Sequence, residues 1–212
     1  MTSIDITEAL KRLAKNYPNP KPGLVFETPF QLLIATILAA QALDTKINQI
    51  TPALFKKYPT PHDLGHAEIS DLEQMIKASG FFHAKARSIK AAALKIDEEF
   101  GGAVPRLMEE LLSLPGVARK TANVVLSYGF NRPVGIVVDT HVLRVCFRMG
   151  ITINKTAEKV EADLLKVIPR KEWGRFPNRI KALGQQICTG RKAYHEKCFL
   201  CDICPKYHYE KG

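Results

Sequence analysis

The sequence predicts an all-α fold divided into two parts. Apolar residues recur at helical spacing along most of the 212 residues. Within the first 130 residues, no segment alternates polar and apolar residues as a strand does. Four closely spaced breakers, Pro18, Pro20, Pro22 and Gly23, form a rigid linker after the first helical segment. We interpret this linker as a seam between the two parts.

The first half of the chain predicts a bundle of helices around one buried member. Residues 30–43 are apolar on nearly every side, which is typical of a helix in the middle of a bundle. Pro59 and Gly80 end two of the neighbouring helices. At least one of Phe81 and Phe82 is expected to pack in the core. The helices expected in this half span 4–14, 30–43, 50–58, 63–78 and 81–100.

A helical hairpin is predicted over residues 107–126. Leucines at helical spacing lead into it, Pro115 stops its first helix, and Gly116 permits a sharp turn. The unpaired N–H groups at the start of its second helix form a site for an anion. The cations Arg119 and Lys120 are unfavourable at a helix N-terminus unless an anion or a reaction compensates. This basic pair distinguishes the segment from an ordinary helical hairpin.

The second half continues with helices after one β-like run. Residues 134–138 would be a strand by pattern alone. Asp139 then precedes a helix, where it is placed to act as the N-cap. Cys146 lies among apolar residues of that helix and is expected to be a small buried hydrophobe. The helices expected in this half span 140–149, 157–167 and 173–184.

Charge and hydropathy favour a polyanionic partner and exclude a membrane span. The formal net charge is +10, and residues 166–212 hold 11 Lys and Arg against 4 Asp and Glu, a difference of 11 − 4 = +7. No apolar run is long enough to cross a bilayer. Residues 1–16 carry charges throughout, unlike a signal peptide. We therefore expect a cytoplasmic protein in which cysteines serve as ligands rather than form disulfides.

Four of the five cysteines lie close together near the C-terminus. They are Cys188, Cys198, Cys201 and Cys204, with the spacing C-x9-C-x2-C-x2-C. Two separate C-x-x-C pairs would indicate zinc, whereas three cysteines in succession at a spacing of three are typical of iron–sulfur ligation. The pattern favours a 4Fe–4S cluster, and zinc remains the alternative.

The hairpin and the segment after it resemble one family of DNA repair enzymes. The string Leu-Pro-Gly-Val-x-Arg-Lys-Thr-Ala at 114–122, followed by Val-Asp-Thr-His-Val at 138–142, resembles the endonuclease III family. The resemblance implies a two-lobed helix-hairpin-helix DNA glycosylase fold, in which residues 134–138 form an extended connector rather than a strand. One lobe would be a helical barrel over residues 22–133. The other would combine residues 1–21 and 134–212 and hold the cluster.

The resemblance also implies an activity and the residues that perform it. The protein would act as a monomer on double-stranded DNA that contains damaged bases or abasic sites. It would be a bifunctional glycosylase and abasic-site lyase that removes oxidised pyrimidines. Lys120 and Asp139 match the family's catalytic lysine and aspartate, and Gln41 matches the glutamine that fills the space left by the extruded nucleotide. The other expected DNA contacts are Leu114, Gly116, Ala118, Arg119, Arg191 and Lys192.

Several positions differ from the family pattern. Ala39 replaces a serine, Leu43 a small polar residue and Ala118 a glycine, and Leu183-Gly184-Gln185 stands where His-Gly-Arg is usual. The family's cysteine spacing is C-x6-C-x2-C-x5-C, so this chain has a longer first loop and a shorter last one.

Two other functions remain as alternatives. A mismatch-specific or adenine glycosylase of the same superfamily is disfavoured by Lys120, which such monofunctional relatives generally lack. The chain also ends shortly after the cysteines, with no lesion-checking domain. The second alternative is a non-catalytic DNA-binding protein that uses the hairpin and the cluster as anchors.

Overall fold

Helices account for the regular structure of this protein. The computed structural model describes residues 4–206, and within this part of the chain no strand is present. The nearest approach to one is an isolated antiparallel bridge between Cys188 and Ala193. The all-α prediction is therefore confirmed. The chain divides into two units, which we call the central unit (Pro22–Arg132) and the terminal unit (Met1–Lys21 with Pro133–Gly212).

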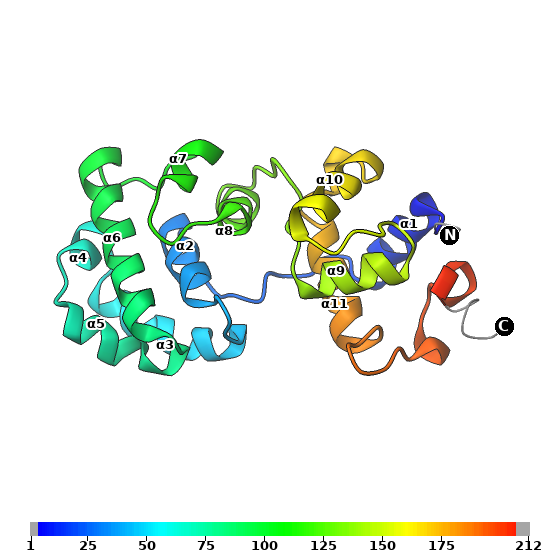
Figure 1. The fold of residues 1–212 in the computed structure, drawn as a ribbon, viewed down its shortest axis with the longest axis horizontal. Helices are drawn as coiled ribbons and strands as arrows, with labels where there is room; N and C mark the ends of the chain where they lie inside the picture. Colours follow the sequence, from blue (N-terminus) through cyan, green and yellow to red (C-terminus); the bar gives the residue numbers. More distant parts are fainter. Residues whose placement is uncertain (1–3, 207–212) are drawn as a thin grey trace. The chain divides into compact units, whose positions relative to one another are not determined.

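The central unit is built around α2 (Pro29–Leu38). Seven of the ten residues of α2 are buried, as expected of a helix that is apolar on every side. It contacts α3, α6, α8 and the π-helical turn η2 (Figure 1). Thr28 caps its N-terminus by accepting a hydrogen bond from the backbone of Gln31. The remaining elements are α3 (Asp44–Lys57), α4 (Pro61–Gly65), α5 (Ile69–Ile76), η1 (Lys77–Ser79), α6 (Phe82–Phe100), α7 (Met108–Leu112), α8 (Arg119–Val124) and η2 (Val125–Gly129).

Two expected helices of this unit differ from those observed. The helix expected over 30–43 ends at Leu38, and a turn containing Gln41 leads directly into α3. The segment expected as one helix over 63–78 is divided into α4, α5 and η1. The break follows Gly65, where an added Cβ would lie 2.8 Å from the backbone of Leu94 on α6. Packing against α6, rather than a local signal in the sequence, therefore fixes this segment.

The terminal unit assembles distant segments of the chain around one apolar core. Helix α11 (Phe176–Gln186) packs on α9 (Thr140–Arg148) and on α1 (Ile6–Asn16). The buried guanidinium of Arg179 on α11 donates to the carbonyl oxygen of Tyr17 and pairs with Glu172. The other elements are α10 (Ala157–Val167), η3 (Arg170–Glu172), η4 (His195–Lys197) and η5 (Cys201–Ile203). The core includes Leu13, Ile136, Val142, Val145, Cys146, Leu164, Phe176, Ile180 and Leu200.

Two smaller expectations for the terminal unit are confirmed. Residues 134–138 form a connector without a strand, in which 134 and 135 make a bend and 136–138 have no regular structure. Cys146 is fully buried, and burial raises the pKa of its thiol. It is therefore an inert core residue. No helix in residues 4–206 combines the length and the apolar composition that crossing a membrane requires.

Candidate functional site

The hairpin turn is held against α6 by a glycine that no other residue can replace without strain. Gly116 has φ 77°, and a Cβ there would lie 2.8 Å from Cβ of Ser88. Leu114 is 2% exposed, and its carbonyl accepts a hydrogen bond from the backbone of Val117. Its own N–H donates to Leu111. Leu114 therefore stabilises the turn, and its predicted contact with DNA stays a prediction.

Helix α8 begins directly after this turn with no side chain capping it. Ala118 occupies the N-cap position in an extended conformation and makes no side-chain cap hydrogen bond. The first-turn N–H groups of a helix without a side-chain cap can serve as donors for an anion. Arg119 and Lys120 follow immediately, and both are exposed. Because Lys120 is exposed, its amine is accessible to a substrate, and protein packing does not desolvate it.

The second predicted catalytic residue caps the next long helix. Oδ1 of Asp139 accepts hydrogen bonds from the backbone N–H groups of His141 (2.9 Å) and Val142 (2.8 Å) at the start of α9. Both cap hydrogen bonds use the same oxygen, so Oδ2 is not committed to the cap. Val138, directly before it, is buried and fixes the connector in the core. Asp139 belongs to the terminal unit and Lys120 to the central unit.

Gln41 has a backbone conformation that glutamine rarely adopts. Its φ is 54°, in the left-handed region, and the residue is exposed in the turn between α2 and α3. Such strain is typically retained at functional positions. In the same turn, the side chain of Leu43 is 74% exposed.

A second strained turn of the central unit carries another exposed apolar residue. Phe81 has φ 49° and is 71% exposed, and Phe82 is only partly buried. Phe81 therefore does not pack in the core, and of the two rings only that of Phe82 is partly buried. Gly80, with φ 71°, turns the chain away from the bundle directly before Phe81. Gly80 is visible in the sequence as a turn residue. The pattern of apolar residues alone, however, does not show that Phe81 is exposed to solvent.

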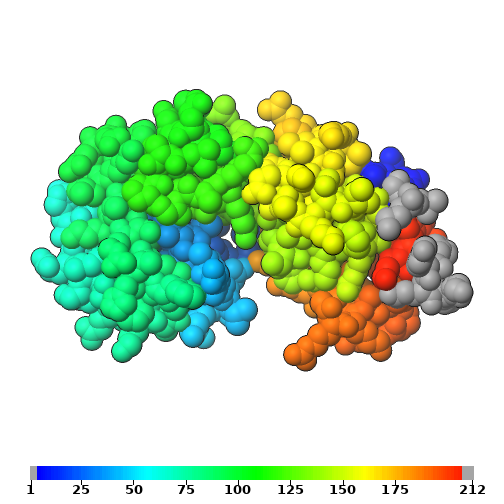
Figure 2. All heavy atoms as spheres, viewed as in Figure 1, coloured from blue at the N-terminus to red at the C-terminus, as the bar shows by residue number. Residues whose placement is uncertain are grey.

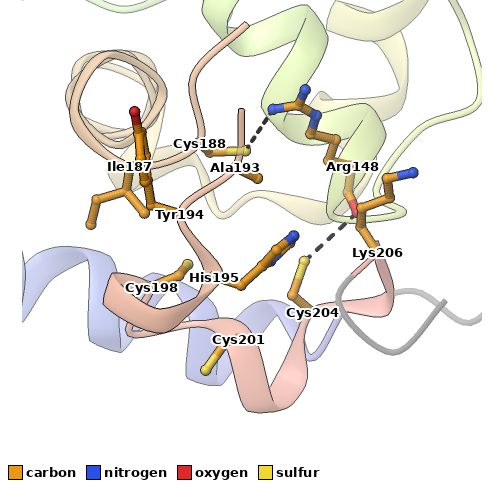
Figure 3. A pocket seen from close by; sticks show the side chains of 10 residues that line it. All are labelled: Arg148, Ile187, Cys188, Ala193, Tyr194, His195, Cys198, Cys201, Cys204 and Lys206. Atoms are coloured by element: carbon orange, nitrogen blue, oxygen red, sulfur yellow. Dashed lines mark hydrogen bonds between the residues drawn. The ribbon is translucent and has the colours of Figure 1, made fainter. Parts of the chain in front are cut away.

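The four clustered cysteines line one pocket of the terminal unit (Figure 3). Cys188 follows the C-terminus of α11, and the other three lie in the turns formed by η4 and η5. The N–H of Cys201 donates to the carbonyl of Cys198, and the N–H of Cys204 donates to that of Cys201. A spacing of three residues thus becomes two successive 3₁₀-type turns.

The long first cysteine loop folds back on itself. Cys188 and Ala193 form an antiparallel bridge, and Oγ1 of Thr189 donates to the carbonyl of Lys192 at 2.6 Å. The added residues form a closed turn, so the longer spacing still returns the chain to the pocket. Arg191 and Lys192 are exposed, and the segment after α11 projects from the surface of the terminal unit (orange in Figure 2).

The pocket combines partly buried thiols with a cation. Burial raises the pKa of the Cys198 thiol to about 11, and repulsion from Cys204, Cys188 and Cys201 adds to this shift. Nη1 of Arg148 lies 3.3 Å from Sγ of Cys188 and donates to the carbonyl of Thr189. The raised pKa favours the neutral thiol of Cys198, so a metal ligand at this residue needs the positive charge of the bound metal.

Comparisons with known proteins place this architecture in one class. The family model for the HhH-GPD superfamily of base excision DNA repair proteins matches residues 34–170. Endonuclease III of Synechocystis sp. is 46% identical over 199 residues, which cover 94% of this chain and 91% of that protein. Endonuclease III of Escherichia coli K12 is 38% identical over 197 residues, covering 93% of each.

Solved structures agree in fold. A trapped covalent intermediate of endonuclease III with DNA has a TM-score of 0.91 at 38% identity, covering 98% of this chain and 97% of that chain. A thermostable thymine-DNA glycosylase shares the fold at a TM-score of 0.85 and 23% identity, covering 96% of each. The fold and the hairpin define a helix-hairpin-helix base excision repair protein. Within this class, the chain belongs to the endonuclease III family.

Proposed function

We propose that this protein excises oxidised pyrimidines from double-stranded DNA and cleaves the abasic site. Lys120 is the nucleophile, and Asp139 accepts a proton or stabilises positive charge on the sugar. The observation that carries the proposal is the exposed Lys120 in the first turn of a helix whose N-terminus no side chain caps. That arrangement offers one group for covalent chemistry and several N–H groups for a phosphate. The endonuclease III trapped with DNA, at 38% identity, forms a covalent intermediate.

The reaction begins with extrusion of the damaged nucleotide, because its sugar is inaccessible within the base stack. The neutral amine of Lys120 attacks C1′, a C–N bond forms, and the base departs with the electrons of the glycosidic bond and a proton. Opening of the sugar gives an iminium ion. Loss of a proton from C2′ then expels the 3′ phosphate, and water releases Lys120 from the remaining imine.

Asp139 contributes through the oxygen that does not cap α9. Oδ1 is held by two N–H groups, so the carboxylate is fixed in orientation. Oδ2 accepts a proton or stabilises positive charge that develops on the sugar as the base leaves. The cap therefore orients the catalytic group.

DNA binding is divided among three parts of the chain. The N–H groups around Gly116 and Ala118 hold a phosphate and position the strand without reading its sequence. Gln41 enters the duplex from its exposed turn and fills the space left by the extruded nucleotide. Arg119 near the hairpin, with Arg191 and Lys192 in the projecting loop, neutralises further phosphates.

The cysteine pocket holds a 4Fe–4S cluster through Cys188, Cys198, Cys201 and Cys204. Supporting this are the four thiols lining one pocket and the arginine beside Cys188. When bound, the cluster supplies positive charge to the thiolates and cross-links α11 to the segment after it. The residues of this chain fit the group. The enzyme acts as a monomer in the cytoplasm, on chromosomal DNA.

Borohydride reduction in the presence of abasic-site DNA tests this proposal, because only an imine-forming amine gives a stable adduct. The native protein should be trapped on the DNA, and Lys120→Gln should give no adduct while it still binds. Lys77→Gln, another exposed lysine of the central unit, serves as the control and should be trapped like the native protein. An undiminished adduct with Lys120→Gln would show that another amine is the nucleophile.

A further inference from the structure

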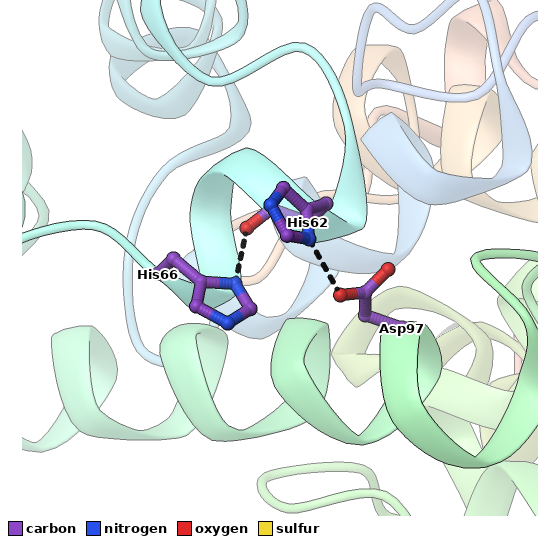
Figure 4. Close-up of side chains that lie close together, drawn as sticks. All are labelled: His62, His66 and Asp97. Carbon is purple, nitrogen blue, oxygen red and sulfur yellow. Dashed lines mark hydrogen bonds and ion pairs between the residues drawn. The ribbon is translucent and has the colours of Figure 1, made fainter.

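A second group of metal-ligand side chains lies on the surface of the central unit, separate from the cysteines. His62 projects from α4, His66 is the residue directly after the C-terminus of α4, and Asp97 projects from α6 (Figure 4). One ligand atom from each residue lies within 4.8 Å of the ligand atoms of the other two. The imidazole rings of the two histidines are 4.3 Å apart between centroids.

The helical spacing and the packing of α4 on α6 bring these groups together. Positions 62 and 66 are four residues apart, so both side chains lie on one face of α4. At Gly65 the two helices approach so closely that a Cβ would lie 2.8 Å from Cα of Leu94. Just beyond α4, Nζ of Lys90 donates to the carbonyl of Ala67 at 2.6 Å. The packing of α4 on α6 therefore fixes the separation of the two histidines from Asp97.

The hydrogen bonds of His62, His66 and Asp97 orient their ligand atoms for a cation. Nδ1 of His66 donates to the carbonyl oxygen of His62 at 2.9 Å, which leaves the lone pair of His66 on Nε2. Metal-binding histidines characteristically use one ring nitrogen in this way. Nδ1 of His62 lies 2.8 Å from Oδ2 of Asp97, so the two groups share a proton that a metal ion can replace. The exposed histidines can adjust by the small distance that coordination requires.

We propose that His62, His66 and Asp97 bind a divalent late transition-metal ion, with zinc as the representative. Two imidazoles and one carboxylate form a ligand set that zinc accepts, with water in its remaining position. The ion joins the end of α4 to α6 and stabilises the central unit by an amount that grows with the logarithm of the zinc concentration once the site is filled. This site is independent of the cysteine pocket and of the reaction proposed for Lys120.

Zinc binding by protein that retains its cysteine-bound cluster tests the proposal. Calorimetric titration with zinc chloride, followed by dialysis and metal analysis, should show one equivalent bound to the native protein at these residues. His66→Gln and Asp97→Asn should each weaken that binding by at least about tenfold, since even outer-shell changes at metal sites cost this much. Thermal unfolding should shift to higher temperature with added zinc in the native protein, with a smaller shift in either variant.

A matched histidine provides the control. His83 is exposed like His62, and its Nδ1 lies 2.8 Å from a carboxylate oxygen of Glu73, but among residues 4–206 no second histidine joins this pair. His83→Gln should therefore retain the bound equivalent and the thermal shift. Because the cysteines are unchanged in every variant, a difference between variants reports the histidine site alone. Equal zinc binding by the native protein, His66→Gln and Asp97→Asn would overturn the proposal.

Discussion

Gly116 lies so close to Ser88 that no side chain fits between them: a Cβ at position 116 would meet Cβ of Ser88 at 2.8 Å. We expect Gly116→Ala to displace the turn and weaken DNA binding, because its N–H groups would no longer face one phosphate. The clash adds to the cost of the left-handed backbone at φ 77°, which is about 1–3 kcal/mol for a non-glycine residue. Thermal unfolding and DNA affinity measure the two effects.

Gly101→Ala is the control for this variant. Gly101 has φ 58°, and a Cβ there meets nothing within 4 Å, so the substitution carries the backbone strain without the clash. It should lower stability while leaving DNA affinity unchanged. Ser88→Gly should partly restore Gly116→Ala, since it removes the atom that clashes. Strict additivity of the two substitutions would contradict the contact as the cause.

Asp139→Asn separates capping from chemistry. An asparagine side chain still offers an oxygen to the two N–H groups, so the free energy of unfolding should change little. Base excision should fall by about 10²–10³-fold, the scale of one lost electrostatic contact in a transition state. Strand cleavage at a preformed abasic site should fall less, because no base has to leave. Single-turnover rates on the two substrates measure the difference.

Asp5 provides the matching helix cap without the proposed chemistry. Its side chain accepts a hydrogen bond from the backbone of Glu8 at the start of α1. Asp5→Asn should therefore leave both rates unchanged. Equal losses on the damaged base and on the preformed abasic site in Asp139→Asn would mean that Asp139 does not act in base departure.

Much of the fold could be predicted because its helices carry local signals. The helix expected over 157–167 has the observed bounds, since apolar spacing and flanking polar residues mark both its ends. The end of α2 could not be predicted, because Ala39 and Ala40 favour a helix and Gln41 is an unusual residue for the left-handed turn that follows. The connector over 134–138 needed the family resemblance, because its β-like run of apolar residues alone predicts a strand.

The sequence names the residues of the candidate site, whose roles stay predictions, but it does not show what surrounds them. Pro115 and Gly116 locate the hairpin turn, yet Ser88 is the contact that excludes a side chain at Gly116. Such a contact joins residues far apart in the chain, and periodicity within one segment does not reveal it.

Replacing a cluster ligand should have a different effect from replacing the buried fifth cysteine. Cys201→Ser should abolish stoichiometric iron and lower the yield of folded protein, because the metal contributes folding free energy. Cys146→Ala should retain about four irons per chain, since Cys146 is fully buried among apolar residues. Iron and sulfide analysis with the visible absorption spectrum measures both. Stoichiometric zinc in the anaerobically purified native protein would contradict the 4Fe–4S assignment.

The salt dependence of DNA binding shows whether Arg191 and Lys192 in the projecting loop contact DNA phosphates. Each phosphate contact contributes about one unit to the slope of log affinity against log salt. Arg191→Ala and Lys192→Ala should each therefore reduce this slope by up to about one unit if the loop meets the backbone. Lys166→Ala is the control, because Lys166 is 74% exposed on α10, where it pairs with Asp163, and no role in binding is proposed for it. Unchanged slopes for both loop variants would place the loop away from DNA, and the proposed contacts of Arg191 and Lys192 would be wrong.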